Sequence, residues 1–170
     1  MELVYPEYTS KSLYNLACGI AEFLGVERVC KGNKIGIPGK RLVLALVDGM
    51  GYKMMENSGI SVDSYITTVF PSTTATVITT LFTAQLPGEH GVLGYTTYSK
   101  GLEGTEFTDV THGKVSNTKT YSNYFDAFYM LGKTLEENYD FVYFYIPDVD
   151  TLAHKHGPNT DVVKEAIRSI

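Results

Sequence analysis

Residues 42–47, Leu-Val-Leu-Ala-Leu-Val, form a continuous apolar run that is followed directly by Asp48 and Gly49. A run of this kind, preceded by a Gly-Lys pair, is typical of a strand buried on both faces of a parallel sheet. Residues 141–146, Phe-Val-Tyr-Phe-Tyr-Ile, predict a second such strand. Since helical patterns alternate with these strands, we predict an α/β fold with a mostly parallel sheet flanked by helices.

The remaining elements follow from apolar spacing and capping residues. Helices are expected at residues 10–24 (capped by Ser10), 51–57, 74–82, 123–138 (broken near Gly132) and from Thr160 onward, and a further strand is expected at 66–70. Residues 88–118, rich in Gly, Thr and Ser, predict a loop-rich insertion. The last helical pattern still runs at Ile170, so we expect residues 1–170 to be the N-terminal portion of one α/β domain.

Composition narrows the class of protein. Hydrophobic residues make up 44% of the chain, which is typical of a globular protein, and the net charge of −5 leaves no basic stripe for a nucleic acid. The apolar runs are too short for a membrane helix, and the N-terminus does not have the basic-then-apolar pattern of a signal segment. We therefore expect a soluble cytoplasmic protein that binds neither nucleic acid nor membrane.

The chain has two cysteines, Cys18 and Cys30, too few for a disulfide framework and not at zinc-site spacing. We expect two buried thiols, which is the common state of free cysteine. A single disulfide stays open as the alternative, mainly for a thermophilic source.

Asp48 is a candidate metal ligand. Ligands of open α/β sheets bind outside the carboxyl ends of the strands, and the glycines at 49 and 51 would let a ligand approach the backbone closely. A carboxylate there suits a divalent cation. A helix N-cap aspartate needs the same position, and this feature alone leaves both interpretations open.

Residues 69–76, Val-Phe-Pro-Ser-Thr-Thr-Ala-Thr, carry hydroxyl groups to the expected start of a helix. Backbone N–H groups and the positive end of the helix dipole can hold a phosphate there while a hydroxyl attacks it. Threonine needs a base or a metal ion for such an attack. Taken alone, this segment is explained more simply by helix capping.

Asp150 and His154 follow the second apolar strand. A carboxylate and an imidazole four positions apart can share one face of a helical turn and bind one metal ion, and mixed O and N ligands suit zinc or manganese better than magnesium. The alternative for this spacing is that both side chains are only solvated at the surface. Asp148 and His156 are weaker candidates that could support the ligands or only be solvated.

In this order, the three segments resemble the type I phosphodiesterase/nucleotide pyrophosphatase family of the alkaline-phosphatase superfamily. Residues 80–92, which begin Thr-Leu-Phe-Thr-Ala and end Pro-Gly-Glu-His-Gly-Val, are similar to the family's T-L-x-T-G … P-x-x-H-G-I stretch. Residues 150–158 are similar to its D-x-x-G-H-x-x-G-P motif, with Ala153 in place of the glycine. The resemblance implies an alkaline-phosphatase-like fold that is incomplete at the C-terminus.

The resemblance also implies the roles of single residues. Counting back without gaps from residues 80–92 makes Thr74 the nucleophile, with Thr73 left open. Asp48 and Thr74 would bind one divalent metal ion, and Asp150 and His154 the other, with zinc expected ahead of manganese. His90 would be structural, as part of the motif's His-Gly turn.

The chain departs from the family pattern in two places. Thr76, Val77 and Ile78 stand where the family commonly has Pro-Asn-His, so the phosphoryl oxygens must be oriented differently. The family's later Asp-His pair and final His have no counterpart, and His112 does not fit. Each metal ion then has about two protein ligands, fewer than the three of a usual catalytic zinc site, so we expect these 170 residues alone to bind metal weakly and to turn over slowly or not at all.

These features together predict metal-dependent hydrolysis of a phosphate ester or of a nucleotide pyrophosphate or phosphodiester through a threonine nucleophile. The partner would be a small phosphorylated substrate or nucleotide. Two alternatives stay open: a mutase of the same superfamily, and a non-catalytic α/β scaffold that binds a partner through a degenerate site.

Overall fold

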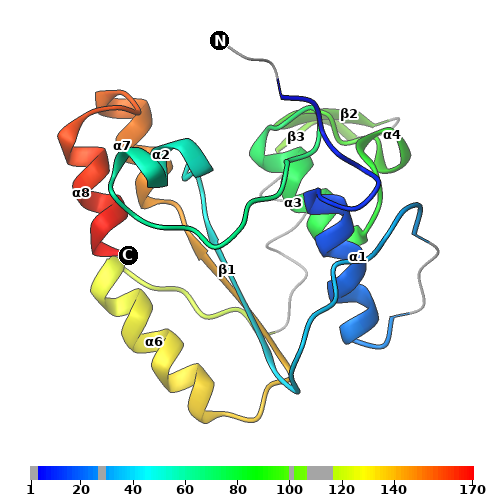
Figure 1. The fold of residues 1–170 in the computed structure, drawn as a ribbon, viewed down its shortest axis with the longest axis horizontal. Coiled ribbons are helices and arrows are strands. Elements are labelled where there is room, and N and C mark those ends of the chain that lie inside the picture. The colour runs from blue at the N-terminus through cyan, green and yellow to red at the C-terminus, as the bar shows by residue number, and fades with distance from the viewer. Residues whose placement is uncertain (1–3, 27–29, 100–101, 107–116) are drawn as a thin grey trace. The chain divides into compact units, whose positions relative to one another are not determined.

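The computed structural model describes residues 4–26, 30–99, 102–106 and 117–170, which Figure 1 shows as a ribbon. The chain folds into two compact units. Unit 1 comprises residues 1–38 and 66–118, and unit 2 comprises residues 39–65 and 119–170. Each unit is described below by itself, and His112 lies outside the described residues.

Unit 2 is built on a small parallel sheet. Strand β1 (Leu42–Val47) pairs with β4 (Phe141–Ile146), with Leu42 opposite Phe141 and Val47 opposite Ile146, and the two lie side by side in Figure 1. Both predicted strands are therefore confirmed, as is their parallel direction. In the described part of the chain this sheet has two strands, so the fold is a mixture of helices and strands with a small parallel sheet. The alkaline-phosphatase-like fold stays a prediction.

Four described helices accompany this sheet: α2 (Tyr52–Asn57), α6 (Tyr124–Glu136), α7 (Asp148–His156) and α8 (Asp161–Ser169). Helix α6 covers one face, where Ala127 packs against Phe144 and Ile146. A second cluster joins α7 to α8 through the buried side chains of Val149, Val163 and Ile167. The predicted break near Gly132 is wrong, because α6 continues to Glu136.

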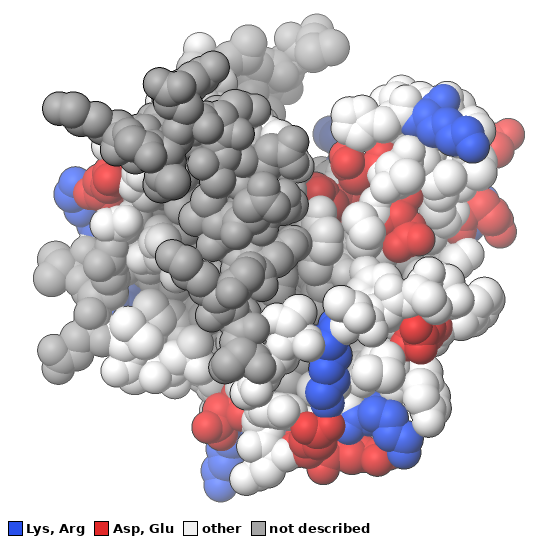
Figure 2. Space-filling view, turned by 180° about the vertical axis from the view of Figure 1, so that it is seen from behind, with Lys and Arg blue, Asp and Glu red and all other residues white. Residues whose placement is uncertain are grey.

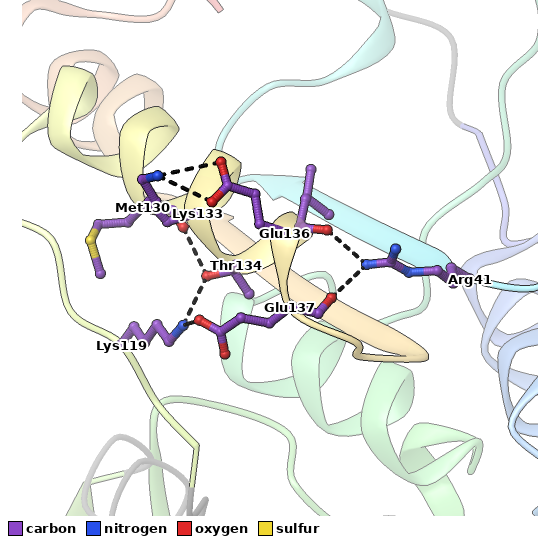
Figure 3. A network of polar contacts seen from close by, with 8 residues as sticks. Arg41, Lys119, Met130, Lys133, Thr134, Glu136 and Glu137 are labelled. Atoms are coloured by element: carbon purple, nitrogen blue, oxygen red, sulfur yellow. Dashed lines mark hydrogen bonds and ion pairs between the residues drawn. The ribbon is translucent and has the colours of Figure 1, made fainter.

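Arg41, just before β1, closes the C-terminal end of α6 (Figure 3). Its Nη2 donates to the carbonyl oxygens of Leu135 and Glu137 at 3.0 and 2.9 Å. Its Nε donates to the carbonyl oxygen of Tyr139 at 3.1 Å. The last carbonyls of a helix have no partner within the helix. The guanidinium therefore gives the Leu135 carbonyl of the last turn a partner, and its bonds to Glu137 and Tyr139 tie the helix end to the starts of both strands.

Unit 1 contains α1 (Leu13–Phe23), α3 (Thr74–Thr83), α4 (Pro87–His90) and the antiparallel pair β2 (Thr96–Ser99) and β3 (Leu102–Glu106). Ser12, and not the expected Ser10, caps α1 through a reciprocal bond pattern with Asn15. The strand expected at 66–70 is wrong, because only Thr67 bridges to Ser12. Strands β2 and β3 lie within residues 88–118, where the sequence predicts loops; the insertion itself stays a prediction.

Cys18 and Cys30 form a disulfide with their Cα atoms 6.2 Å apart, so the expectation of two free thiols is wrong. Cys18 is fully buried on α1. The adjacent Lys31 N–H donates to the Tyr14 hydroxyl at 2.6 Å, which holds the same segment on the same helix. Disulfides persist mainly in oxidising compartments. The pairing therefore weighs against the predicted cytoplasmic location, which stays a prediction.

Surface charge is balanced locally. On the face shown in Figure 2, the described Lys and Arg side chains lie next to Asp and Glu side chains. Ion pairs within α6 and α8 illustrate this, with Lys133 bonded to Glu136 and Arg168 to Glu165. Exposed pairs of this kind contribute about 0–1 kcal/mol each, so they do little to fix the fold. A separate observation is that the helices in the described ranges are too short or too polar to span a bilayer.

The Arg41 contacts predict a stability effect. Replacing Arg41 with Ala should lower the free energy of unfolding of unit 2 by about 1–2 kcal/mol, because three carbonyls lose a charged donor. Lys133→Ala, in the same network, should have a much smaller effect because Lys133 only pairs with the exposed Glu136. Urea unfolding followed by circular dichroism measures both, and equal losses for the two variants would contradict the capping role.

Candidate functional site

The carboxyl ends of β1 and β4 bring two candidate residues to one edge of unit 2. Asp48 directly follows β1, and its N–H donates to the carbonyl of Ile146, the last residue of β4, at 2.9 Å. Helix α7 begins two residues later, at Asp148, so Asp150 lies in its first turn. The predicted position of both carboxylates at the strand ends is confirmed, whereas their role is not tested by the fold.

Gly49 allows the two segments to touch. Its φ is +71°, and a Cβ at this position would lie 2.7 Å from the Cα and 2.9 Å from the Cβ of Asp150. Non-bonded carbon atoms do not approach this closely, because their optimal separation is about 3.5–4.0 Å. The Asp48-Gly49 turn therefore needs glycine for two reasons, its left-handed backbone and its direct packing on Asp150.

Both oxygens of the Asp48 carboxylate accept hydrogen bonds. The Gly49 N–H donates to Oδ1 at 2.9 Å, and the Tyr145 hydroxyl donates to Oδ2 at 2.6 Å. Burial raises the pKa of Tyr145, and the hydrogen bond to Asp48 raises it further, so the phenol keeps its proton. Sequence reasoning missed Tyr145, which was one of 13 tyrosines without an assigned role.

Asp150 and His154 share one side of α7. The His154 Nε2 lies 3.5 Å from the Asp150 Oδ2, and 82% of the histidine side chain is exposed. The structure therefore confirms that the side chains of Asp150 and His154, four positions apart, lie next to each other on α7. Asp148 stands in the first turn of the helix, where its negative charge complements the helix dipole, and His156 stands in the last turn.

The donor set fits a divalent cation only in part. A carboxylate oxygen and an imidazole nitrogen 3.5 Å apart are ligands that zinc and manganese accept. Within the described ranges, however, no group of three or more His, Cys, Asp or Glu side chains could hold a metal ion. A catalytic zinc usually has three protein ligands. Asp150 and His154 alone therefore supply fewer ligands than such a site needs.

Thr74 belongs to unit 1 and is the first residue of α3. Thr73 is the N-cap residue, but its side chain makes no capping bond and instead lies 2.9 Å from the Thr76 hydroxyl. Its main-chain carbonyl accepts the first helical bond, from Val77. The predicted helix start is confirmed, and Thr74 is half-buried there.

His90 connects α4 to α3. The Val92 N–H donates to its Nδ1 at 3.1 Å, so the proton of the neutral ring is on Nε2 and donates to the Thr80 hydroxyl at 3.0 Å. Burial lowers the pKa of His90, which favours this neutral form. These contacts confirm the structural role expected for the His-Gly turn.

The His90 contacts predict that acid destabilises unit 1. Because the folded-state pKa is below the unfolded-state value of about 6.5, the unfolded chain takes up the proton first as the pH falls. The stabilisation is therefore complete above about pH 6.5 and is lost below it. The stability difference between the wild type and His90→Gln should shrink from pH 7.5 to 5.5 in denaturant unfolding. A His90 NMR titration with a pKa above its usual value would contradict this.

The Gly49 contact predicts a local requirement for glycine. Gly49→Ala should cost about 1–2 kcal/mol for the left-handed backbone alone, and the overlap with Asp150 adds to this. Gly51→Ala is the matched control, because a Cβ there would meet open space. Urea unfolding of both variants measures the difference, and similar losses would show that the contact with Asp150 does not restrict this position.

Comparison with known proteins gives one finding that bears on this site. The family model for type I phosphodiesterase / nucleotide pyrophosphatase matches residues 51–130, which include Thr74, Thr80 and His90 but not Asp48, Asp150 or His154. Searches of curated proteins and of solved structures gave no significant match. Residues 51–130 of this chain therefore match the type I phosphodiesterase/nucleotide pyrophosphatase family, which confirms the resemblance that the motifs indicated.

Proposed function

We propose that the protein hydrolyses a phosphate ester, or a nucleotide pyrophosphate or phosphodiester, with Thr74 as the nucleophile. The match of residues 51–130 carries this proposal, because it supports phosphodiesterase/pyrophosphatase-type hydrolysis and covers the whole segment around Thr74. The substrate would be a small phosphorylated molecule or a nucleotide.

The start of α3 suits the proposed role of Thr74. The first N–H groups of a helix have no partner within the helix, and the helix dipole is positive there. They could bind phosphoryl oxygens while the Thr74 hydroxyl attacks phosphorus. The hydroxyl groups of Thr73 and Thr76 bond to each other at the start of the same helix.

Asp48, Asp150 and His154 are the proposed metal ligands. The family resemblance suggests two divalent ions, with zinc ahead of manganese. A divalent ion bound by these residues would polarise the phosphoryl oxygens and lower the pKa of an oxygen nucleophile. The chain itself contributes two carboxylates at adjacent strand ends and one imidazole that is largely exposed to solvent.

A non-catalytic scaffold is the second candidate, and Val77 favours it. Val77 stands where the family commonly has the asparagine that helps to hold the phosphoryl oxygens, and its side chain cannot donate a hydrogen bond. The retained Asp150–His154 pair supports the enzyme instead. A superfamily mutase would use similar ligands and remains a variant of the enzyme proposal.

The proposal predicts metal-dependent hydrolysis of p-nitrophenyl phosphate or bis-p-nitrophenyl phosphate. Thr74→Ala should reduce the rate by at least about a thousandfold, since the nucleophile is lost. Thr83→Ala is the matched control, because its hydroxyl only donates to the Thr79 carbonyl of the same helix. The absorbance of the released p-nitrophenol, followed in the presence of zinc or manganese, measures the rates of both variants.

The outcomes separate the candidates. Activity that needs metal and disappears in Thr74→Ala supports the enzyme, and the preferred ester distinguishes a monoesterase from a diesterase. Activity that survives in Thr74→Ala but not in Thr73→Ala would identify Thr73 as the nucleophile instead. Because these 170 residues alone are expected to turn over slowly or not at all, the decisive assay uses the full-length gene product, and its complete lack of hydrolysis with both esters would favour the mutase or the scaffold.

A further inference from the structure

Helix α6 has an apolar face on each of two opposite sides. The inner face packs on the sheet through Ala127 and Leu131. The outer face has the i, i+3, i+4, i+7 spacing of one helix side and consists of Phe125, Phe128, Tyr129 and Gly132. Solvent reaches 83% of Phe125 and 64% of Tyr129. A surface helix normally carries polar residues on its outer side, and a helix that is apolar on both sides is normally covered on both.

Gly132 stands at the C-terminal end of this outer face and is costly there. Glycine inside a helix is destabilising relative to alanine, because it loses more backbone freedom on folding. A Cβ at Gly132 would meet open space, so no described residue of the chain requires a glycine at this position. The missing side chain instead leaves room on the outer face for a side chain of a second molecule to approach the helix backbone.

We propose that the outer face of α6 is a dimer interface, on which α6 of a second copy of this chain packs in the antiparallel direction. A two-fold axis midway between Phe128 and Tyr129 makes the face self-complementary, because each contact then occurs twice. Phe125 lies three positions before Phe128, and Gly132 lies three positions after Tyr129. The axis therefore places the Phe125 ring of each copy on Gly132 of the other. Aromatic rings are typical of the centre of such interfaces.

The charges beside the outer face favour the antiparallel direction. Asp126 lies in the first turn of α6 and Lys133 in the last, and their spacing of two turns places both on the same edge of the face. Antiparallel copies bring Asp126 of each copy next to Lys133 of the other, whereas parallel copies bring like charges together. Lys133 pairs with Glu136 within the helix, and because this pair is exposed, exchanging it for Asp126 of the second copy costs little.

Sedimentation velocity of the whole chain over a wide range of concentrations measures the association. An interface of one helix from each copy is at the small end of specific interfaces, below about 1,200 Å² in total, so we expect a weak dimer whose average mass rises with concentration. Phe125→Ser should weaken the dimer by at least about tenfold, because a central aromatic anchor is lost. Tyr5→Ser is the matched control, since 76% of Tyr5 is exposed on unit 1, and it should change the affinity less than about twofold.

Gly132→Leu separates an interface from a purely structural role. Leucine favours the helix, so the urea midpoint of unit 2 should rise. The same side chain would fill the space that the Phe125 ring of the second copy needs, so the dimer should weaken by about tenfold. A structural role alone predicts only the change in the urea midpoint. A Gly132→Leu variant that dimerises as tightly as the wild type would overturn the proposal.

Charge variants test the direction of packing. Lys133→Glu and Asp126→Lys each bring like charges together in their own dimers, whereas an equimolar mixture of the two restores both opposite-charge pairs. We therefore expect the mixture to associate more tightly than either variant alone. Equal association of the mixture and the separate variants would contradict the antiparallel arrangement. A wild type that stays monomeric at every concentration would exclude the second copy and assign the outer face to a different protein.

Discussion

The parallel pairing of β1 with β4 is the constraint on which the rest of unit 2 depends. It places residues that are 97 positions apart, Asp48 and Tyr145, within one hydrogen bond of each other. Helix α6 can cover the sheet because Phe144 and Ile146 point to the same face, and Arg41 then joins the end of that helix to the strand starts. The contact of Gly49 with Asp150 arises at the opposite end of the same two strands.

Local patterns in the sequence predicted the parts of the site that are local. The spacing of Asp150 and His154 was enough to place both on one side of α7, and the Pro-Ser-Thr turn was enough to start α3 at Thr74. Tyr145 could not be found in this way. Alternation along a strand shows which residues share a face, but only the register with β1 shows that this hydroxyl reaches Asp48.

Non-local contacts explain the wrong predictions as well. Helix α6 passes through Gly132, at a cost of about 1 kcal/mol relative to alanine, because its other residues pack on the sheet. Residues 66–70, Ile-Thr-Thr-Val-Phe, resemble a strand, but within them only Thr67 forms a β-bridge, to Ser12. The family match covers Thr74 and His90. Asp48, Asp150 and His154 lie outside the matched residues, so only the fold of unit 2 shows where they are placed.

The disulfide has a consequence for how the two units respond to their surroundings. Cys18 and Cys30 are the two cysteines of the chain, and both belong to unit 1. A disulfide that closes a loop of this size lowers the conformational entropy of the unfolded chain, and this stabilises the folded state by about 3 kcal/mol. A reducing medium would withdraw that contribution from unit 1, whereas unit 2 contains no cysteine. The redox potential of the medium is thus a variable that can change the stability of the unit that carries Thr74.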